Sequence, residues 1–125
     1  MHELIYRSRA TGPFDRTEIG KILATARREN ERHGVTGLLL YSDASFLQVL
    51  EGDAEAVQET FARITVDPRH RDIEVLAHAP IERRAHPDWT MGFHHLDGFL
   101  VAPGEVLDLD RARAVLALHA PHAVG

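Results

Sequence analysis

The sequence has no cysteine in its 125 residues and no excess of positive charge. The first absence excludes disulfide bonds, thiolate catalysis, iron–sulfur clusters and cysteine-based zinc sites. The 14 lysines and arginines are outnumbered by 19 aspartates and glutamates, which gives a formal net charge of −5. Domains that bind nucleic acids are typically basic, so we expect no nucleic acid as a partner.

Long hydrophobic runs are also missing, and the N-terminal segment mixes polar with apolar side chains. A membrane-spanning helix needs about 20 apolar residues in succession, and a secretion signal needs an apolar stretch near the N-terminus. The sequence therefore predicts no membrane segment and no signal peptide. Together with the lack of cysteine, this favours a soluble protein of the cytoplasm that has no membrane partner.

The common sequence motifs of catalysis do not occur either. There is no glycine-rich dinucleotide fingerprint, nucleophile elbow or paired-carboxylate motif. Among the 9 histidines, His94 and His95 are neighbours on an expected strand and point to opposite faces, so we expect no metal site. An acylphosphatase-like hydrolase would need an anion-binding loop after the first strand, where Pro13 removes one of the N–H groups. We therefore expect no enzymatic activity.

What is present is a regular alternation of strand and helix patterns. The spacing of apolar residues predicts the strands, and capping and breaking residues predict where the helices begin and end. The strands are expected at residues 2 to 8, Gly37 to Tyr41, Phe46 to Leu50, Ile73 to Ala77 and Trp89 to His94. The helices are expected from a capping box at Asp15 to Gly34, from Asp53 to a point before Pro68, and at Asp110 to His119.

This order of elements predicts an α+β fold with a ferredoxin-like βαββαββ mixed sheet. Two crossover helices are expected on one face of the sheet and the C-terminal helix on the other, because a half-apolar sheet needs a second layer. Right-handed crossovers should place the first and third strands side by side and parallel at the centre. We expect residues 1–97 to form the core and residues 98–125 to form a capping helix region of the same domain.

Three polar residues fall at positions that should be buried. Gln48 lies in the middle of a central strand, Tyr6 lies in the neighbouring strand, and Asn30 continues the apolar stripe of the first helix. A buried amide without partners costs about 1–3 kcal/mol, so these groups need hydrogen bonds. Each could be an ordinary core residue satisfied by backbone or water. All three, however, converge on the side of the sheet that the crossover helices cover.

Apolar side chains of the two helices would enclose this polar group. The expected walls are Ile22, Leu23, Val57, Phe61 and Ile64. A cleft with apolar walls, an amide at its rim and an amide–phenol pair on its floor suits a flat heteroaromatic ligand. The last expected strand places Trp89, Met91 and Phe93 on a common face, and a plain core strand remains the alternative for that pattern.

Taken together, these segments resemble the BLUF family of flavin-binding blue-light sensor domains. The resemblance covers about residues 2 to 95, with the segments in the family's order. They are Leu4 to Ser8, Asn30, Val35 to Gly37, Phe46 to Gly52, Asp67 to His70 and Trp89 to Met91. One departure is visible, because Ala26 stands where some members carry a serine that could hydrogen-bond an inward Trp89.

The resemblance implies that FAD, or FMN, is held non-covalently between the two crossover helices. It implies that Tyr6 gives an electron and then a proton to the excited flavin, and that Gln48 bridges the flavin edge and the Tyr6 hydroxyl. Asn30 would hydrogen-bond the carbonyl edge of the ring, while Trp89 and Met91 would report the rearrangement of Gln48 to the last strand. Further contacts are implied near the ribityl or phosphate side at Asp67, Arg69 and His70.

The function that the resemblance implies is a photoswitch rather than an enzyme. Few residues follow Met91, so we expect the signal to reach a downstream protein in trans or to pass within a homo-oligomer. The alternative from a different class is a light-independent ferredoxin-like regulatory module that binds a small ligand or a protein. The yellow colour of a bound flavin would distinguish the two interpretations.

Overall fold

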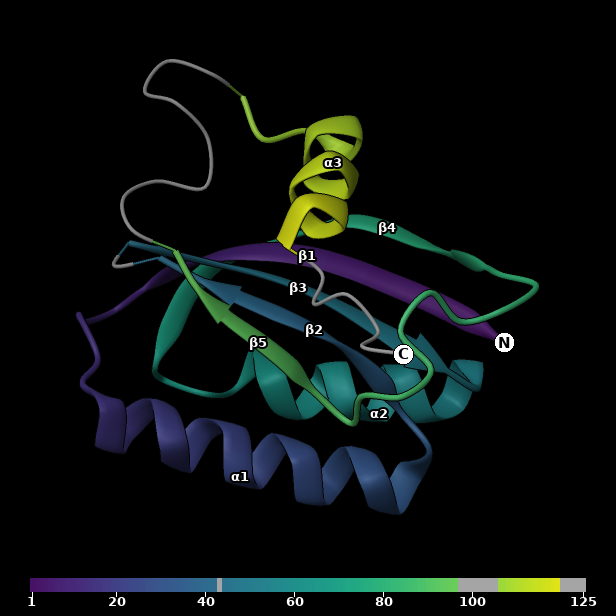
Figure 1. Ribbon diagram of the computed structural model, residues 1–125, viewed down its shortest axis with the longest axis horizontal. Helices are drawn as coiled ribbons and strands as arrows, with labels where there is room; N and C mark the ends of the chain where they lie inside the picture. The colour runs from purple at the N-terminus through teal and green to yellow at the C-terminus, as the bar shows by residue number, and fades with distance from the viewer. Residues whose placement is uncertain (43, 97–105, 120–125) are drawn as a thin grey trace.

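The computed structural model describes residues 1–42, 44–96 and 106–119 (Figure 1). Its elements follow the strand and helix order expected from the sequence. They are β1 (His2–Ala10), α1 (Arg16–His33), β2 (Thr36–Tyr41), β3 (Ser45–Gly52), α2 (Ala54–Thr65), β4 (His70–Pro80), β5 (Gly92–His95) and α3 (Leu109–His119). The boundary expected at residue 97 lies outside the described residues.

The strands form one mixed sheet in the order β4-β1-β3-β2-β5. β1 and β3 are neighbours at its centre, as expected, but the expectation that they are parallel is wrong, because they run antiparallel. The crossover through α1 leaves β1 and β2 parallel with one position between them. The hairpin strand β3 fills this position and must run in the opposite direction. The mixed character of the sheet comes from β2 and β5, which are parallel neighbours.

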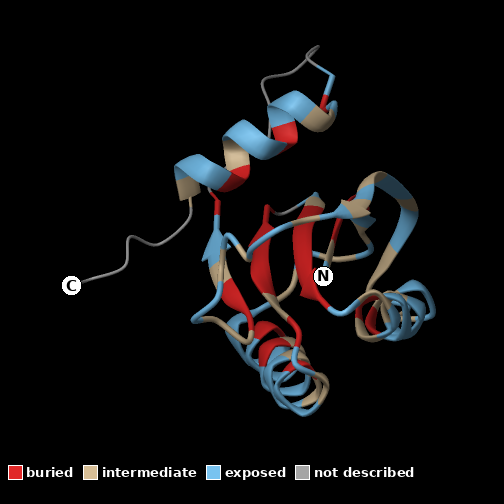
Figure 2. Cartoon of the chain, turned by 90° about the vertical axis from the view of Figure 1, so that its right-hand side faces the viewer, coloured by how far each residue is buried: buried red, intermediate tan, exposed pale blue. Residues whose placement is uncertain are grey.

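Helices α1 and α2 cover one face of the sheet and α3 lies over the other, so the buried strands are enclosed from both sides (Figures 1 and 2). Alternate residues of β1 serve the two cores, as the period of two in a strand requires. Leu4 and Tyr6 belong to the core beneath α1 and α2. Ile5 belongs to the core beneath α3, together with Ala112 and Leu116. The α+β architecture expected from the sequence is confirmed.

The ends of α1 are set by local chemistry, as the sequence predicts. A side-chain oxygen of Asp15 accepts a hydrogen bond from the N–H of Glu18 at 2.8 Å, which satisfies one of the free donors at the helix start. Gly34 ends the helix with φ at 68°, in the left-handed region that glycine enters without strain. This end matters for the site, because it fixes the last turn of α1, which contains Asn30.

The last strand begins later than its sequence pattern predicts. β5 starts at Gly92 rather than at Trp89, and the expected common face for Trp89, Met91 and Phe93 is wrong. Met91 and Phe93 pack into the core beneath α1 and α2. The ring of Trp89 instead lies beside Gly92 and Leu38, where it fills the space that a Cβ on Gly92 would need. Side chains alternate between two faces only in an extended strand, and the strand begins at Gly92. The alternation expected for Trp89 and Met91 therefore does not apply.

Within the part of the chain that the structure describes, no helix combines the length and the apolar character that crossing a membrane requires.

Candidate functional site

A cavity of about 320 Å³ opens between α1 and α2, above the centre of the sheet. The sheet contributes the floor, with Tyr6, Leu39, Phe46 and Gln48. One wall comes from α1, with Ile22, Thr25, Ala26, Glu29 and Asn30. The opposite wall comes from α2, the turn after it and the first residue of β4, with Thr60, Arg63, Ile64, Asp67, Arg69 and His70. The lining is mainly apolar, and its polar groups lie on the floor, along the α1 wall and at the α2 end.

The floor of the cavity is a buried phenol–amide pair. Tyr6 and Gln48 are directly opposite each other on β1 and β3, and both side chains are almost fully buried. The Tyr6 hydroxyl donates a hydrogen bond to Oε1 of Gln48. Burial raises the pKa of the Tyr6 hydroxyl far above its ordinary value, and the Asp67 carboxylate raises this pKa further. Tyr6 is therefore a protonated phenol with a fixed acceptor.

The other end of the Gln48 amide contacts a sulfur atom. Nε2 of Gln48 donates a hydrogen bond to Sδ of Met91 at 3.3 Å. Met91 is buried, whereas Trp89 is half-buried and stacks on His86 with ring centroids 5.6 Å apart. Of the two residues expected to report on Gln48, the structure therefore places Met91 against the amide and Trp89 on the other side of the segment.

Asn30 joins the helix wall to the segment before β5. Its side chain is buried, and Nδ2 donates a hydrogen bond to the carbonyl of Thr90 at 2.6 Å. The backbone carbonyl of Asn30 accepts the bonds that close the helix, from the N–H groups of Gly34 and Val35. The side-chain amide is therefore not needed at the helix end and lies on the cavity wall, on the face of α1 where the apolar stripe of the first helix predicted it.

His70 and the Asp67–Arg69 pair form the α2 end of the cavity. Nε2 of His70 donates to the carbonyl of Ile64 at 2.7 Å, because that oxygen can only accept, and Nδ1 lies 2.7 Å from the Ser8 hydroxyl. Asp67 binds the guanidinium of Arg69 at 3.0 Å and also its backbone N–H at 2.9 Å. These bonds pre-order the end of the cavity where the resemblance expects the ribityl or phosphate side of the ligand.

Three expected wall residues do not line the cavity among the described residues. Leu23 and Val57 lie in the core beneath α1 and α2, and Phe61 packs against the Tyr6 ring with centroids 5.5 Å apart. The cavity instead follows a neighbouring stripe of each helix. Sequence reasoning missed its members Thr25, Glu29, Thr60 and Arg63, and the sheet residues Leu39 and Phe46. On α1, steps of three and four residues lead from Ile22 to Thr25 and on to Glu29, and on α2 they lead from Ile64 back to Thr60 and from Thr60 on to Arg63. In the sheet, Leu39 is opposite Gln48 and Phe46 is two residues before it on the same face, so these spacings could have found all six.

The family model described as BLUF, sensors of blue-light using FAD, matches residues 1–92. The chain belongs to the BLUF family. The photoactivated adenylate cyclase subunit beta of Euglena longa is 42% identical over 89 residues, which are 70% of this chain and 10% of that protein. This BLUF chain therefore spans about a tenth of the length of the curated relatives that it matches.

Solved BLUF proteins share the fold. The dark state structure of BlrB, a BLUF protein, matches with a TM-score of 0.73 and 38% sequence identity, over 75% of this chain and 71% of that one. The photo-activated state of BlsA matches with a TM-score of 0.81 and 26% sequence identity, over 94% of this chain and 92% of that one. The chain is thus a flavin-binding blue-light sensor domain, and the light-independent alternative is not favoured.

The residues around the cavity fit a flavin. Ligand pockets in proteins usually measure about 300–1,000 Å³ and combine apolar walls with a few placed polar groups, as this one does. In the hydrogen bonds described above, the Asn30 and Gln48 amides each commit one N–H to the protein. An amide has two N–H groups and an acceptor oxygen, so both retain capacity for the carbonyl and nitrogen edge of the ring.

Proposed function

We propose that this BLUF domain switches through the hydrogen-bonded chain of Tyr6, Gln48 and Met91. The observation that carries the proposal is that one buried amide binds a phenol at its oxygen end and a thioether at its nitrogen end. Asn30 and the amide of Gln48 would hold the flavin edge, with Ile22 and Ile64 against its faces. Bound flavin supplies the absorption of blue light and the redox chemistry that follows.

The Gln48 amide has two discrete arrangements. In the arrangement described above, its oxygen accepts from Tyr6 and its N–H donates to Met91. If the amide turns end for end, Nε2 faces the phenol and Oε1 faces the Met91 sulfur. Oxygen and thioether sulfur are both acceptors, so the bond to Met91 must break in the second arrangement. A small local rearrangement would thus be felt at Met91, which is the behaviour required of a switch.

From Met91 the change has a direct path to the opposite face of the molecule. β5 begins at the next residue, and the His94 ring on this strand stacks on the His119 ring of α3 with centroids 4.9 Å apart. We infer that α3 and the face around it carry the signal to a downstream protein in trans or to a second copy of the chain. On this proposal the domain itself is a sensor without enzymatic activity.

Absorption spectroscopy tests the proposal. The chain is purified, loaded with FAD or FMN, and measured before and after blue illumination. We expect a yellow protein whose flavin band shifts to the red in light and returns in the dark. A chain that takes up neither flavin, or whose bound flavin shows no reversible shift, would contradict the proposal.

A further inference from the structure

The segment before β5, residues 84–91, is tied to the body of the domain at both of its ends. At its start, the Arg84 guanidinium donates to the carbonyl of Gly34 at 2.7 Å and to the carbonyl of Glu51 at 3.0 Å. The Glu51 carboxylate is buried and accepts the backbone N–H groups of Ala85 at 2.7 Å and His86 at 2.8 Å. This anchor leaves the far end of the segment, next to Gln48, to be held by other groups.

At that far end, three consecutive carbonyls each accept a hydrogen bond. The Trp89 carbonyl accepts from the N–H of Gly37 at 3.1 Å, and the Thr90 carbonyl accepts from Nδ2 of Asn30 at 2.6 Å. The Met91 carbonyl accepts from Nε of Arg27 at 3.0 Å. Two donors come from α1 at positions three apart, which lie on one face of a helix. The same face of α1 therefore holds the backbone on which Met91 approaches Gln48.

Arg27 is used differently from the arginines around it. Arg28 and Arg32 lie 3.9 Å and 3.8 Å from the carboxylate of Glu29, and both are exposed. Within the described residues Arg27 has no such carboxylate, and its Nε donates to a neutral backbone carbonyl. A charged donor makes a hydrogen bond about twice as strong as a neutral one, so this bond is a firm constraint on Met91. Arg27 does not line the cavity, so its side chain can be changed without removing a wall.

We propose that Arg27 is a positioning residue of the switch, which holds the Met91 thioether against the Gln48 amide through the Met91 carbonyl. The proposal rests on the proposed function, because it assigns a role within that hydrogen-bonded chain. Without the Arg27 donor, the Met91 backbone keeps the bonds of its neighbours but loses its own, so the Gln48 amide is less restrained. The barrier between its two arrangements falls, and the light state returns faster in the dark.

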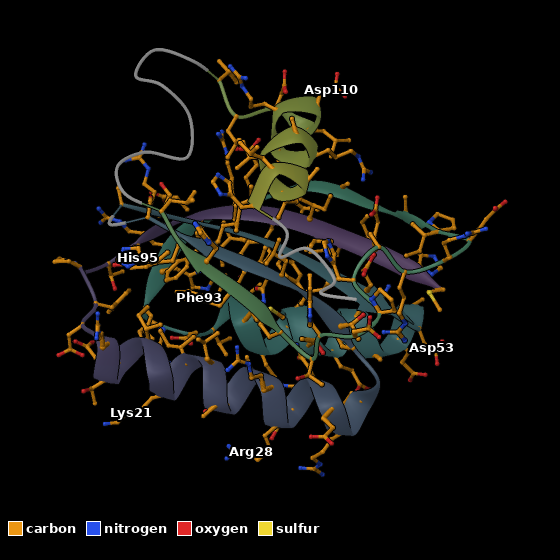
Figure 3. All side chains as sticks on the ribbon, viewed as in Figure 1. Lys21, Arg28, Asp53, Phe93, His95 and Asp110 are labelled. Atoms are coloured by element: carbon orange, nitrogen blue, oxygen red, sulfur yellow. The ribbon has the colours of Figure 1, made fainter. Side chains whose placement is uncertain are left out.

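The experiment compares Arg27→Leu with Arg28→Leu in the flavin-loaded full chain. Arg28 is a matched control, because it is the next residue of α1 and points away from the sheet (Figure 3). The chain has 2 methionines, so methyl-¹³C methionine labelling gives one signal from buried Met91 and one from half-exposed Met1. We expect Arg27→Leu to shift the Met91 signal and leave the Met1 signal in place. Arg28→Leu should move neither signal, and Arg27→Lys, which restores a cationic donor, should bring the Met91 signal back toward its original position.

The dark recovery rate supplies a second readout. We expect Arg27→Leu to accelerate recovery about threefold, a change near the lower end of the interaction energies measured between residues in contact. In a Met91→Leu background, the same substitution should cause no further acceleration. An unmoved Met91 signal, or an acceleration that persists without Met91, would overturn the proposal. If the unsubstituted chain shows no photoshift, the proposed function fails instead, and the methionine signals alone decide whether Arg27 positions Met91.

Discussion

The Tyr6 hydroxyl donates to Oε1 of Gln48 from the directly opposite position on the neighbouring central strand. Neither residue has another phenol or carboxamide opposite it, because Gln48 faces Leu39 on its second side and Tyr6 faces Val75. Across the sheet the pair is isolated, because apolar residues face it from both flanking strands, and the cavity lies above it. The Tyr6 hydroxyl therefore has Gln48 as its acceptor, whereas the Gln48 amide also donates to Met91.

Replacing Tyr6 with phenylalanine should keep flavin binding and abolish the photoshift. The ring remains in the core, but the hydroxyl proton that Gln48 accepts is lost, at a cost of about 1 kcal/mol in the free energy of unfolding. The measurement is the light-minus-dark absorption spectrum. Tyr41→Phe is the matched control, since Tyr41 is also buried and hydrogen-bonded but does not line the cavity. Equal photoshifts in both variants would argue against a role for Tyr6.

Replacing Gln48 with leucine should likewise retain flavin and remove the photoshift. This change also leaves the buried Tyr6 hydroxyl without an acceptor, which should lower the free energy of unfolding by about 1–3 kcal/mol. The double variant with Tyr6→Phe removes both partners and should therefore be less destabilised than the sum of the single changes. Chemical denaturation of the original chain, the two single variants and the double variant measures the difference. Gln58→Leu, on the exposed side of α2, is the control. Strictly additive losses of unfolding free energy would contradict an interaction between Tyr6 and Gln48.

Replacing Asn30 with alanine should weaken flavin binding. The change removes an amide from the cavity wall and frees the Thr90 carbonyl, so the segment before β5 also loses one of its anchors. Loss of a buried hydrogen bond of about 1–3 kcal/mol corresponds to a dissociation constant raised roughly five- to 150-fold. Titration of the apoprotein with FAD, followed by flavin fluorescence, measures the change. An affinity equal to that of Glu31→Ala, an exposed neighbour on α1, would show that Asn30 does not contact the ligand.

The stability of the domain should fall in mild acid, partly because of His86. Burial lowers the pKa of His86 from 6.5, although the nearby Glu51 carboxylate opposes the shift. The unfolded chain therefore binds this proton more readily than the folded chain does. The contribution to stability is full above pH 6.5 and is lost as the pH falls through the unfolded pKa toward the folded one.

His86→Phe tests this sign, because phenylalanine can still stack on Trp89. We expect the variant to lose less unfolding free energy than the original chain between about pH 7.5 and pH 5.5. Urea unfolding followed by circular dichroism, at both pH values, measures this loss for the variant and for the original chain. The same or a steeper loss in the variant would show that His86 does not contribute in the expected direction.

Most of the local structure could be predicted from the sequence. The helix start capped by Asp15, the stop at Gly34 and the strand that begins the chain depend on neighbours in the sequence, and all three are confirmed. The BLUF family membership and the α+β architecture are confirmed as well. Signalling in trans, homo-oligomer formation and a cytoplasmic location stay predictions, as do the domain boundary and the roles assigned to individual site residues.

What the amino-acid order determined by itself is the set of elements and the burial of Tyr6, Asn30 and Gln48, because periodicity and capping act over a few residues. The stripe of α1 that faces the cavity was decided only by the tertiary structure. The same holds for the choice of Met91 over Trp89 as the neighbour of Gln48. These features depend on contacts between segments that are far apart in the chain, and no local pattern records which of several compatible contacts forms.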